Sequence, residues 1–214
     1  MNEEKKRGPK VRNAIATQKR ILRAAKQEFA KNGLAGARVD VIAKRAKANK
    51  RMIYHYFANK EGLFKRVVEN AYIDIRNAEQ DLDLEHLPPQ EALAVLVQFT
   101  WEYYLENPEF INLVNSENLH KAKHLKKSDL ISQVSRRYVR MVSDILERGV
   151  KTGVFRVGVD PVQLNITIAA ISYYYLTNQY TGAIIYERNL IASKALKERL
   201  AFNVDTILRI VRVD

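Results

Sequence analysis

Residues 17–63 hold several short stretches of helical periodicity joined by connections of a few residues, and few folds are compatible with such spacing. Apolar residues recur at helical spacing over 21–29, between a capping Thr17 and the helix-ending pair Asn32-Gly33. A second, shorter helix is predicted over 39–46. Segment 47–49 is a tight turn, and Asn49 is a favourable N-cap for a third helix over 50–56. This pattern predicts a helix-turn-helix within a three-helix unit.

The rest of the chain also has helical periodicity, and no segment shows the alternation of a β-strand. Helices are expected from Lys60 (capped by Asn59), over 89–105, from Pro108 to about residue 118, around 131–145 with an end at Gly153, over 161–180, and from Ser193 onward. The helix over 92–105 is apolar on nearly every side, which predicts a central buried position. The predicted fold class is all-α, with a flexible basic arm over 1–14 and domains over 15–62 and 63–214.

Positive charge is concentrated in the first third of the chain. Residues 1–65 contain 18 Lys and Arg against 5 Asp and Glu, a net charge of +13, whereas the remaining 149 residues contain 18 against 19. A basic surface can serve nucleic acid, an anionic membrane or solubility. A compact basic module attached to a nearly neutral body favours a polyanion as the partner.

Several classes of function lack the residues they need. The chain has no cysteine, which excludes disulfides, thiolate metal sites and a cysteine nucleophile. It has no glycine-rich phosphate loop, nucleophile elbow or paired carboxylates in apolar surroundings, so neither enzyme activity nor a cofactor is expected. The start of the sequence lacks an apolar signal segment, and the longest apolar run, 166–176, is too short to span a bilayer. A cytoplasmic protein with no membrane partner is predicted.

One constellation of metal-ligating residue types is present. Glu117, His120 and His124 share a helix face at i, i+3 and i+7, a spacing that could chelate a metal ion. Lysines stand at positions 121, 123, 126 and 127, and their charge would repel a cation. We therefore predict no metal site.

The segment "AAKQEFAKNGLAGARVDVIAKRAKANKRMIYHYFANKEGLF" resembles the DNA-binding domain of the tetracycline-repressor (TetR) family of bacterial regulators. The resemblance covers residues 17–65, and the helix order that follows is similar to the larger ligand-binding and dimerisation domain of that family. It implies a transcriptional regulator, most simply a repressor, that binds a pseudo-palindromic DNA operator as a homodimer and is released by a small-molecule effector. An architectural or ligand-independent DNA-binding protein is the alternative, but about 150 residues of neutral, aromatic-rich helix favour a sensor.

The sequence departs from the family pattern at two places. The second helix of the family usually starts with Thr or Ser, and this chain has Ala37-Arg38, so a hydroxyl cap is missing and Arg38 could contact phosphate instead. The turn usually reads Ala-Gly-Val-Ser, and here it reads Ala-Lys-Ala-Asn. Lys47 is poorly suited to a left-handed backbone conformation. A strained or slightly altered turn is therefore expected.

The third predicted helix has one packing face and one DNA-facing surface. Ile53 and Phe57, at i and i+4, form the packing pair. Arginine can read guanine with about 1–3 kcal/mol of discrimination, Met52 could touch a thymine methyl, and Tyr and Lys side chains suit phosphate oxygens. Tyr56 is equally compatible with core packing. The predicted DNA-binding residues are Arg38, Lys50, Arg51, Met52, Tyr54, His55, Tyr56 and Lys60. The arm "KKRGPKVR" is interpreted as a solubilising tail, with insertion of Arg7 into a minor groove as the alternative.

Effector and dimer contacts are assigned to the remaining helices. The central helix and its neighbours supply aromatic and amide side chains that suit a mostly apolar pocket, although core packing would select the same residues. The predicted effector-binding residues are Gln98, Phe99, Trp101, Tyr103, Phe110, Asn115, Tyr138, Tyr174 and Asn178. The last two helices, over 162–180 and 194–212, are apolar on more than one face and are expected to form a four-helix dimer interface.

Overall fold

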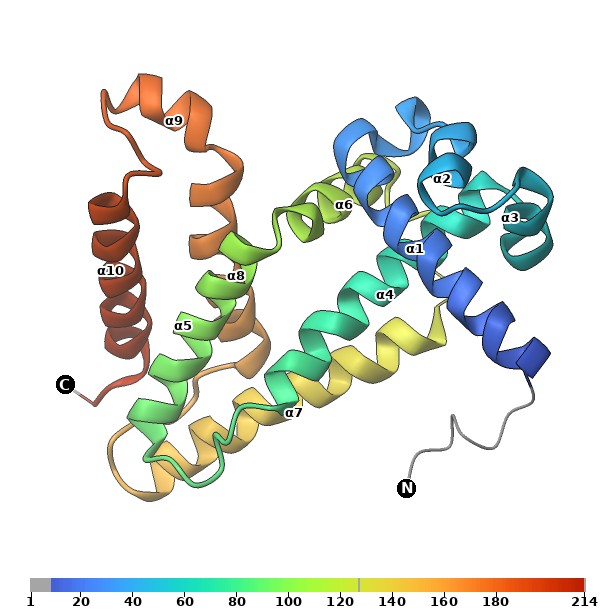
Figure 1. The fold of residues 1–214 in the computed structure, drawn as a ribbon. Coiled ribbons are helices and arrows are strands. Elements are labelled where there is room, and N and C mark those ends of the chain that lie inside the picture. The colour runs from blue at the N-terminus through green and yellow to red at the C-terminus, as the bar shows by residue number, and fades with distance from the viewer. Residues whose placement is uncertain (1–8, 127, 214) are drawn as a thin grey trace. The chain divides into compact units, whose positions relative to one another are not determined.

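The computed structural model of the chain describes residues 9–126 and 128–213, and this part of the chain contains ten helices and no strand (Figure 1). The all-α prediction is confirmed. The helices are α1 (Pro9–Gly36), α2 (Val39–Arg45), α3 (Lys50–Phe57), α4 (Lys60–Gln80), α5 (Pro89–Glu106), α6 (Pro108–Leu119), α7 (Asp129–Lys151), α8 (Pro161–Thr177), α9 (Gln179–Ile185) and α10 (Ser193–Val211). Within the described ranges no helix is both long and apolar enough to cross a membrane.

The chain divides into two compact units. The first unit runs to Tyr72 and also includes Asn112–Asp129, and the second consists of Ile73–Ile111 and the chain from Leu130 onward. The sequence predicted a single boundary at 62/63. The two compact units divide within α4, within α6 and at the start of α7.

The first unit has a core shared by α1, α2, α3 and α4. The rings of Phe29 and Phe64 meet edge to face, with centroids 5.1 Å apart. Ile42 of α2 and Ile53 of α3 are completely buried. Burial of side chains of this size contributes about 1.5–3 kcal/mol each. The short helices α2 and α3 are therefore held by tertiary packing rather than by their own propensity.

Helix α1 begins earlier than predicted. It starts at Pro9, so residues 9–14 of the predicted arm are helical, while residues 1–8, including Arg7, lie outside the described residues. Thr17 is buried within the helix, where its hydroxyl accepts a hydrogen bond from Arg20 Nη2 at 3.1 Å instead of capping a helix start. The predicted helix end at Gly33 is present as a break in helical geometry, with φ of +64°, a conformation that glycine adopts without steric cost.

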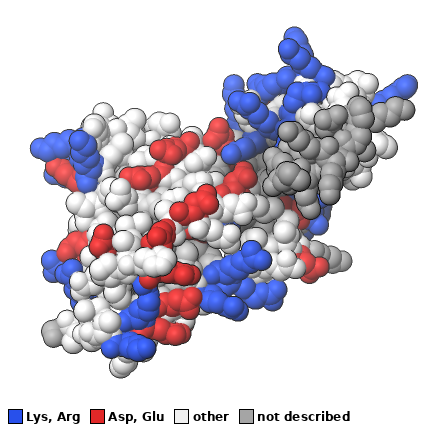
Figure 2. Space-filling view, turned by 60° about the horizontal axis from the view of Figure 1, so that its bottom comes forward, with Lys and Arg blue, Asp and Glu red and all other residues white. Residues whose placement is uncertain are grey.

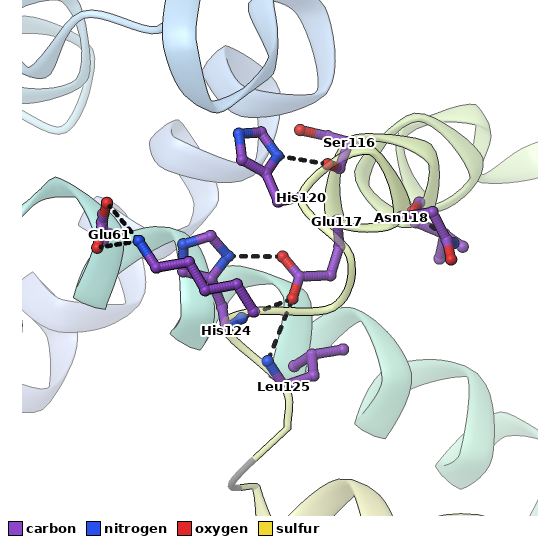
Figure 3. A network of polar contacts seen from close by, with 9 residues as sticks. Glu61, Ser116, Glu117, Asn118, His120, His124 and Leu125 are labelled. Atoms are coloured by element: carbon purple, nitrogen blue, oxygen red, sulfur yellow. Dashed lines mark hydrogen bonds and ion pairs between the residues drawn. The ribbon is translucent and has the colours of Figure 1, made fainter.

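Segment 112–129 is held together by a buried carboxylate (Figure 3). Glu117 accepts hydrogen bonds from the backbone amides of His124, at 2.8 Å, and Leu125, at 3.1 Å, and from His124 Nδ1 at 2.7 Å. The His124 ring packs edge to face on Phe64, with centroids 5.2 Å apart. Ser128 donates a hydrogen bond to Glu69 Oε1 at 2.7 Å. These contacts, all within the first unit, attach the segment to α4.

The same contacts explain the acid and histidine pattern that suggested a metal site. Glu117 and His124 bind each other, and His120 Nδ1 instead lies 2.7 Å from the carbonyl oxygen of Ser116. Among the residues that the structure describes, no group of three or more His, Cys, Asp and Glu side chains is arranged to hold a metal ion.

The core of the second unit is built around α5, which packs against α8 and α10. Buried residues lie on several faces of α5, among them Leu93, Leu96 and Trp101, in agreement with the predicted central helix. Helix α8 starts as predicted, because the Asp160 carboxylate accepts a hydrogen bond from Val162 N at 2.7 Å. It ends at Thr177 rather than near Tyr180, and a separate helix, α9, follows.

Side chains bind the last carbonyl groups of α8. Thr177 Oγ1 donates a hydrogen bond to Tyr173 O at 2.9 Å, and Asn178 Nδ2 donates to Tyr174 O at 2.9 Å. The backbone amide of Asn178 also donates to Tyr174 O, at 3.0 Å, so the helical ladder continues to the C-cap and these side chains add to it. The chain turns at Asn178, and α9 begins at the next residue.

Candidate nucleic-acid interface

The turn between α2 and α3 fixes the direction of α3. Lys47 has φ of +49°, so the residue that replaces the family's glycine adopts the left-handed conformation expected for this position. Such a conformation costs a non-glycine residue roughly 1–2 kcal/mol. Asn49 then caps α3 as predicted, because its side-chain oxygen accepts a hydrogen bond from Met52 N at 2.8 Å. Burial of Ile53 anchors the other side of the helix.

The free surface of α3 carries the side chains that were predicted to bind DNA. Lys50, Arg51, Tyr54 and His55 are exposed, whereas Met52 and Tyr56 are partly buried. Tyr56 lies between His55 and Phe57, with ring centroids at 5.3 and 6.2 Å. Tyr56 therefore has both packing contacts and accessible surface, which leaves both of its predicted roles open.

An acidic side chain stands beside this surface. Asp40, in the first turn of α2, forms an ion pair with Lys50, and Arg38 Nη2 lies 4.0 Å from its other oxygen. The hydrogen bond from Lys50 holds the pKa of Asp40 below its ordinary value. Sequence reasoning missed Asp40. The available signal was that it is the only acidic residue between Glu28 and Glu61 in an otherwise basic segment.

The start of α2 is held by a carboxylate of α1, which binds the amide of the N-cap residue itself and not an amide of the first turn, as a hydroxyl cap would. Arg38 is the N-cap residue, and its side chain forms no capping hydrogen bond. The buried Glu28 carboxylate accepts a hydrogen bond from the Arg38 backbone amide at 3.2 Å. The Arg38 side chain remains exposed, as a phosphate contact requires.

Lys60 lies at the start of α4 as predicted, but its ammonium group already has a partner. Lys60 Nζ donates a hydrogen bond to Ala35 O at 3.1 Å, near the C-terminal end of α1. Asn59 caps α4 by accepting a hydrogen bond from Gly62 N at 2.7 Å. A Cβ atom at position 62 would collide with the carbonyl oxygen of Phe57, so this tight connection requires glycine.

Basic side chains gather on this part of the molecule. In the face shown in Figure 2, Lys and Arg are grouped over the helix-turn-helix part, whereas Lys, Arg, Asp and Glu are mixed over the rest. An excess of positive charge on one surface is the electrostatic pattern of proteins that bind the phosphate backbone.

The structure does not bring the nine predicted effector residues together. Trp101 and Phe110 are buried in aromatic packing, with Trp101 against Tyr175 and Phe110 stacked on Tyr104. Gln98 is exposed and donates a hydrogen bond to Glu102. Phe99, Tyr103 and Phe110 do lie together, with the Tyr103 ring 5.7 Å from that of Phe99 and 6.0 Å from that of Phe110 between centroids. The others lie elsewhere: Asn115 belongs to the first unit, Tyr138 lines one cavity, and Tyr174 and Asn178 line another. Aromatic content identified core positions here, not one pocket.

The cavity next to Tyr138 has a volume of about 260 Å³ and is lined by the end of α4, segment 82–85 and α7. Arg76 forms a 2.6 Å ion pair with the buried Glu79 carboxylate and lies 3.8 Å from the centroid of the Tyr138 ring. Burial raises the pKa of Glu79 to about 7, against the opposing effect of Arg76. Burial also raises the pKa of Tyr138 to about 12. The cavity thus offers cationic, acidic and aromatic groups within one small space.

A capped recognition helix with an exposed basic and aromatic face defines a helix-turn-helix DNA-binding protein. Residues 21–67 match the family model described as bacterial regulatory proteins, tetR family, and residues 89–207 match the C-terminal domain of tetracyclin repressor-like proteins. The chain belongs to the TetR family and is a DNA-binding transcriptional regulator rather than an enzyme.

Individual relatives agree with this assignment. The chain is 36% identical over 210 residues to the HTH-type transcriptional repressor NicS of Pseudomonas putida, covering 98% of this chain and 99% of the relative. It is 34% identical over 143 residues to the HTH-type transcriptional repressor SCO4008 of Streptomyces coelicolor, covering 66% and 71%. A TetR family transcription regulator from Marinobacter aquaeolei shares the fold, with a TM-score of 0.70 at 16% identity over 93% of this chain and 97% of that one.

Proposed function

We propose that this chain is a repressor that binds a pseudo-palindromic operator as a dimer and releases it when a small molecule binds the second unit. The observation that carries the proposal is the exposed face of α3. Its side chains Lys50, Arg51, Tyr54 and His55 all face solvent and are not part of the core. The relatives NicS and SCO4008 are named as repressors, which favours repression over activation. Because the DNA target lies in the bacterial cytoplasm, we infer the same location for the protein.

Each side chain of the surface has a distinct proposed role. Arg51 is exposed and forms no ion pair within the described residues, so it is free to read a guanine in the major groove. Arg38, Lys50, Tyr54 and Tyr56 contact phosphate oxygens, while Met52 and His55 approach base edges. Lys60 keeps its hydrogen bond to Ala35 O, so it contributes to the interface by supporting α1 and by its charge.

We propose that α8 and α10 form the dimer interface. Three apolar side chains follow one side of α8, because they are four and eight residues apart. They are exposed in the single chain: Val162 by 44%, Ile166 by 56% and Tyr174 by 61%. Phe202 on α10 is exposed by 60%. Exposed apolar stripes of this kind are typical of protein contacts, and regulators of this family usually act as dimers. A symmetric pair of recognition helices then reads the two half-sites of the operator.

We propose that the effector binds in the cavity beside Arg76, Glu79 and Tyr138. It combines an arginine, a buried carboxylate and a tyrosine ring, and its charged groups include residues at the end of α4. The same continuous helix contains Lys60, directly after the recognition helix. Repacking around Arg76 would shift α4 and with it the recognition helices of the dimer, whose spacing on B-DNA has to stay near 34–36 Å.

The DNA-binding part of the proposal is tested by operator selection. Duplexes that bind are selected from a random library, and affinities for the selected operator and a shuffled duplex are measured by fluorescence anisotropy. Arg51→Ala is expected to cost about 1–3 kcal/mol on the operator and much less on the shuffled duplex. Arg136→Ala, at an exposed arginine on α7 in the second unit, is the matched control. Equal losses on both duplexes would contradict a base-reading role for Arg51.

Release by an effector is tested by calorimetry on compounds that raise the melting temperature. A true effector lowers operator affinity, and operator DNA lowers effector affinity by the same factor. Substitution of Arg137, which lines the cavity, by Met should weaken the compound without weakening DNA binding in its absence. A compound that binds with the same affinity in the presence and absence of operator would rule out this mechanism for that compound.

A further inference from the structure

A second cavity, of about 530 Å³, lies in the second unit between the last turn of α8, α9, the turn that follows α9, and α10. It shares no lining residue with the cavity beside Glu79. Its wall is fixed by a hydrogen bond from the Tyr175 hydroxyl to Leu190 O at 2.8 Å. Its size lies within the range of pockets that enclose small organic molecules.

The charge of this cavity is one-sided. Arg188 and Arg199 line it, and no Asp or Glu is among the described residues that do. Tyr174, Tyr175 and Tyr186 also line the cavity, with Asn178 and Thr181 as polar groups. Two guanidinium groups with three aromatic rings suit a ligand that is both anionic and flat.

Arg199 lacks the partner that a partly buried guanidinium usually has. Its Nη2 donates a hydrogen bond to Ile171 O at 2.9 Å, but its buried Nε has no hydrogen-bond partner. Within the described part of the chain Arg199 forms no ion pair, and its guanidinium faces the rings of Tyr175 and Phe202, 5.2 and 5.3 Å from their centroids. Burial lowers the pKa of this group. An arginine nevertheless stays charged, so the site carries an uncompensated positive charge.

We infer that the cavity formed by α8, α9 and α10 is a binding site for a small aromatic carboxylate, whose anionic group pairs with Arg199 and whose ring lies among the tyrosines. Carboxylates match the planar donor groups of arginine, and charge-assisted bonds of this kind are the strong ones. The site is separate from the proposed effector cavity, so it gives the regulator a second small-molecule input. Tyr174 belongs both to this cavity and to the apolar stripe proposed for the dimer, so that input acts at the edge of the proposed interface.

The test uses the full chain and a panel of probe anions: benzoate, phenylacetate and indole-3-acetate, with benzamide and acetate as the neutral and the ring-free comparisons. Isothermal titration calorimetry is expected to show saturable binding of at least one aromatic carboxylate. Arg199→Met, which keeps the length of the side chain and removes its charge, should weaken that binding about 10- to 100-fold. Benzamide and acetate should bind more weakly by a similar factor, since each lacks one of the two recognised features.

Further variants make the result specific. Arg188 is exposed, so Arg188→Glu should fold normally and still weaken the anion, which keeps the test valid even if Arg199→Met proves unstable. Arg209→Met on the same helix and Arg137→Met in the other cavity should bind the anion as the unmodified chain does. The inference is overturned if no aromatic carboxylate binds at millimolar concentration, if benzamide binds as well as benzoate, or if Arg137→Met removes binding and Arg188→Glu does not. A second reading is that a second copy of the chain fills the cavity. Loss of the dimer in Arg199→Met, together with no anion binding to the unmodified chain, would support that reading and overturn the inference.

Discussion

The Lys50 ammonium pairs with the Asp40 carboxylate, so the first turn of the recognition helix is tied to the first turn of α2 by an exposed ion pair. Exposed ion pairs contribute little to folding stability. We therefore expect the main effect of this pair to be on DNA binding. Asp40 orients Lys50 and, at the same time, places a negative charge where phosphates approach. Asp40 should therefore favour the position of the protein on DNA in which Lys50 meets a phosphate, and disfavour positions in which a phosphate approaches Asp40 itself.

Asp40→Asn is therefore expected to raise affinity for shuffled DNA, by about 3- to 10-fold, while operator affinity changes less, so that the specificity ratio falls. Removal of one negative charge should also steepen the salt dependence by about one unit of log affinity per log salt concentration. Anisotropy titrations over a range of salt measure both quantities. Asp83→Asn, which removes the same charge from an exposed contact with His86 outside the proposed dimer helices, is the control. If Asp40→Asn weakened both duplexes equally, the carboxylate would serve the start of α2 instead.

The second prediction concerns Glu79, whose pKa burial raises from 4.5 to about 7. Between these two values the folded chain holds a proton that the unfolded chain has released, so the free energy of unfolding should fall as the pH rises. The loss is complete above about pH 7 and is on the order of 3 kcal/mol. Glu79→Gln keeps an acceptor for Arg76 and has no proton to lose. Its stability difference between about pH 5 and about pH 8 should be smaller by that amount.

Urea denaturation followed by circular dichroism at the two pH values measures this difference. Glu102→Gln, which removes an exposed carboxylate on α5, provides the comparison. The same pH dependence in Glu79→Gln and in the unmodified chain would mean that Glu79 is ionised throughout, held in that state by Arg76.

The helix starts could be predicted from the sequence because cap chemistry is local. Asn49, Asn59 and Asp160 each accept a hydrogen bond from an amide two or three residues further on, as their neighbours in the sequence indicate. Thr17 is also a residue that favours the N-cap position, but it lies inside α1, which begins eight residues earlier. A capping residue therefore predicts a helix start only where the preceding residues cannot themselves continue the helix.

The parts that could not be predicted depend on contacts between distant segments. Segment 112–129 joins the first unit through Glu117, His124 and Ser128, and nothing in its periodicity indicates this. The role of Asp40 needs the distance to Lys50, ten residues away in the sequence. The effector residues were chosen as aromatic side chains, but aromatic side chains fill cores as readily as pockets. Arg76 and Glu79, which line the cavity, stand on a helix whose pattern indicates no site.

The third prediction concerns Asn203, which is completely buried on α10 and whose two amide atoms find no hydrogen-bond partner in the described part of the chain. An unsatisfied buried amide costs about 1–3 kcal/mol. Asn203→Leu, which keeps the branched shape of the side chain, should therefore raise the free energy of unfolding by about that amount, or the melting temperature by roughly 2–4 °C per kcal/mol. Thermal unfolding at one fixed protein concentration measures it. Ser172→Ala, at a second buried side chain whose hydroxyl has no partner, should stabilise in the same direction. A less stable Leu variant would mean that the amide is satisfied in the assembled protein.

The fourth prediction tests the dimer through Ile166, an exposed isoleucine in the apolar stripe of α8. If this stripe packs on a partner, Ile166→Glu places an unpaired carboxylate in the interface. The free energy of association should then become less favourable by on the order of 3–5 kcal/mol. Light scattering at micromolar concentration is expected to give a dimer for the unmodified chain and a monomer for Ile166→Glu, with unchanged helical content. Operator affinity should fall about 100-fold or more, because a monomer engages one half-site only.

Val157→Glu places the same charge on an exposed apolar residue outside α8 and α10 and should remain a dimer. A dimer that survives Ile166→Glu with the same dissociation constant would show that the interface lies elsewhere, and the exposed residues of α9, Ile184 and Ile185, would be the next to substitute.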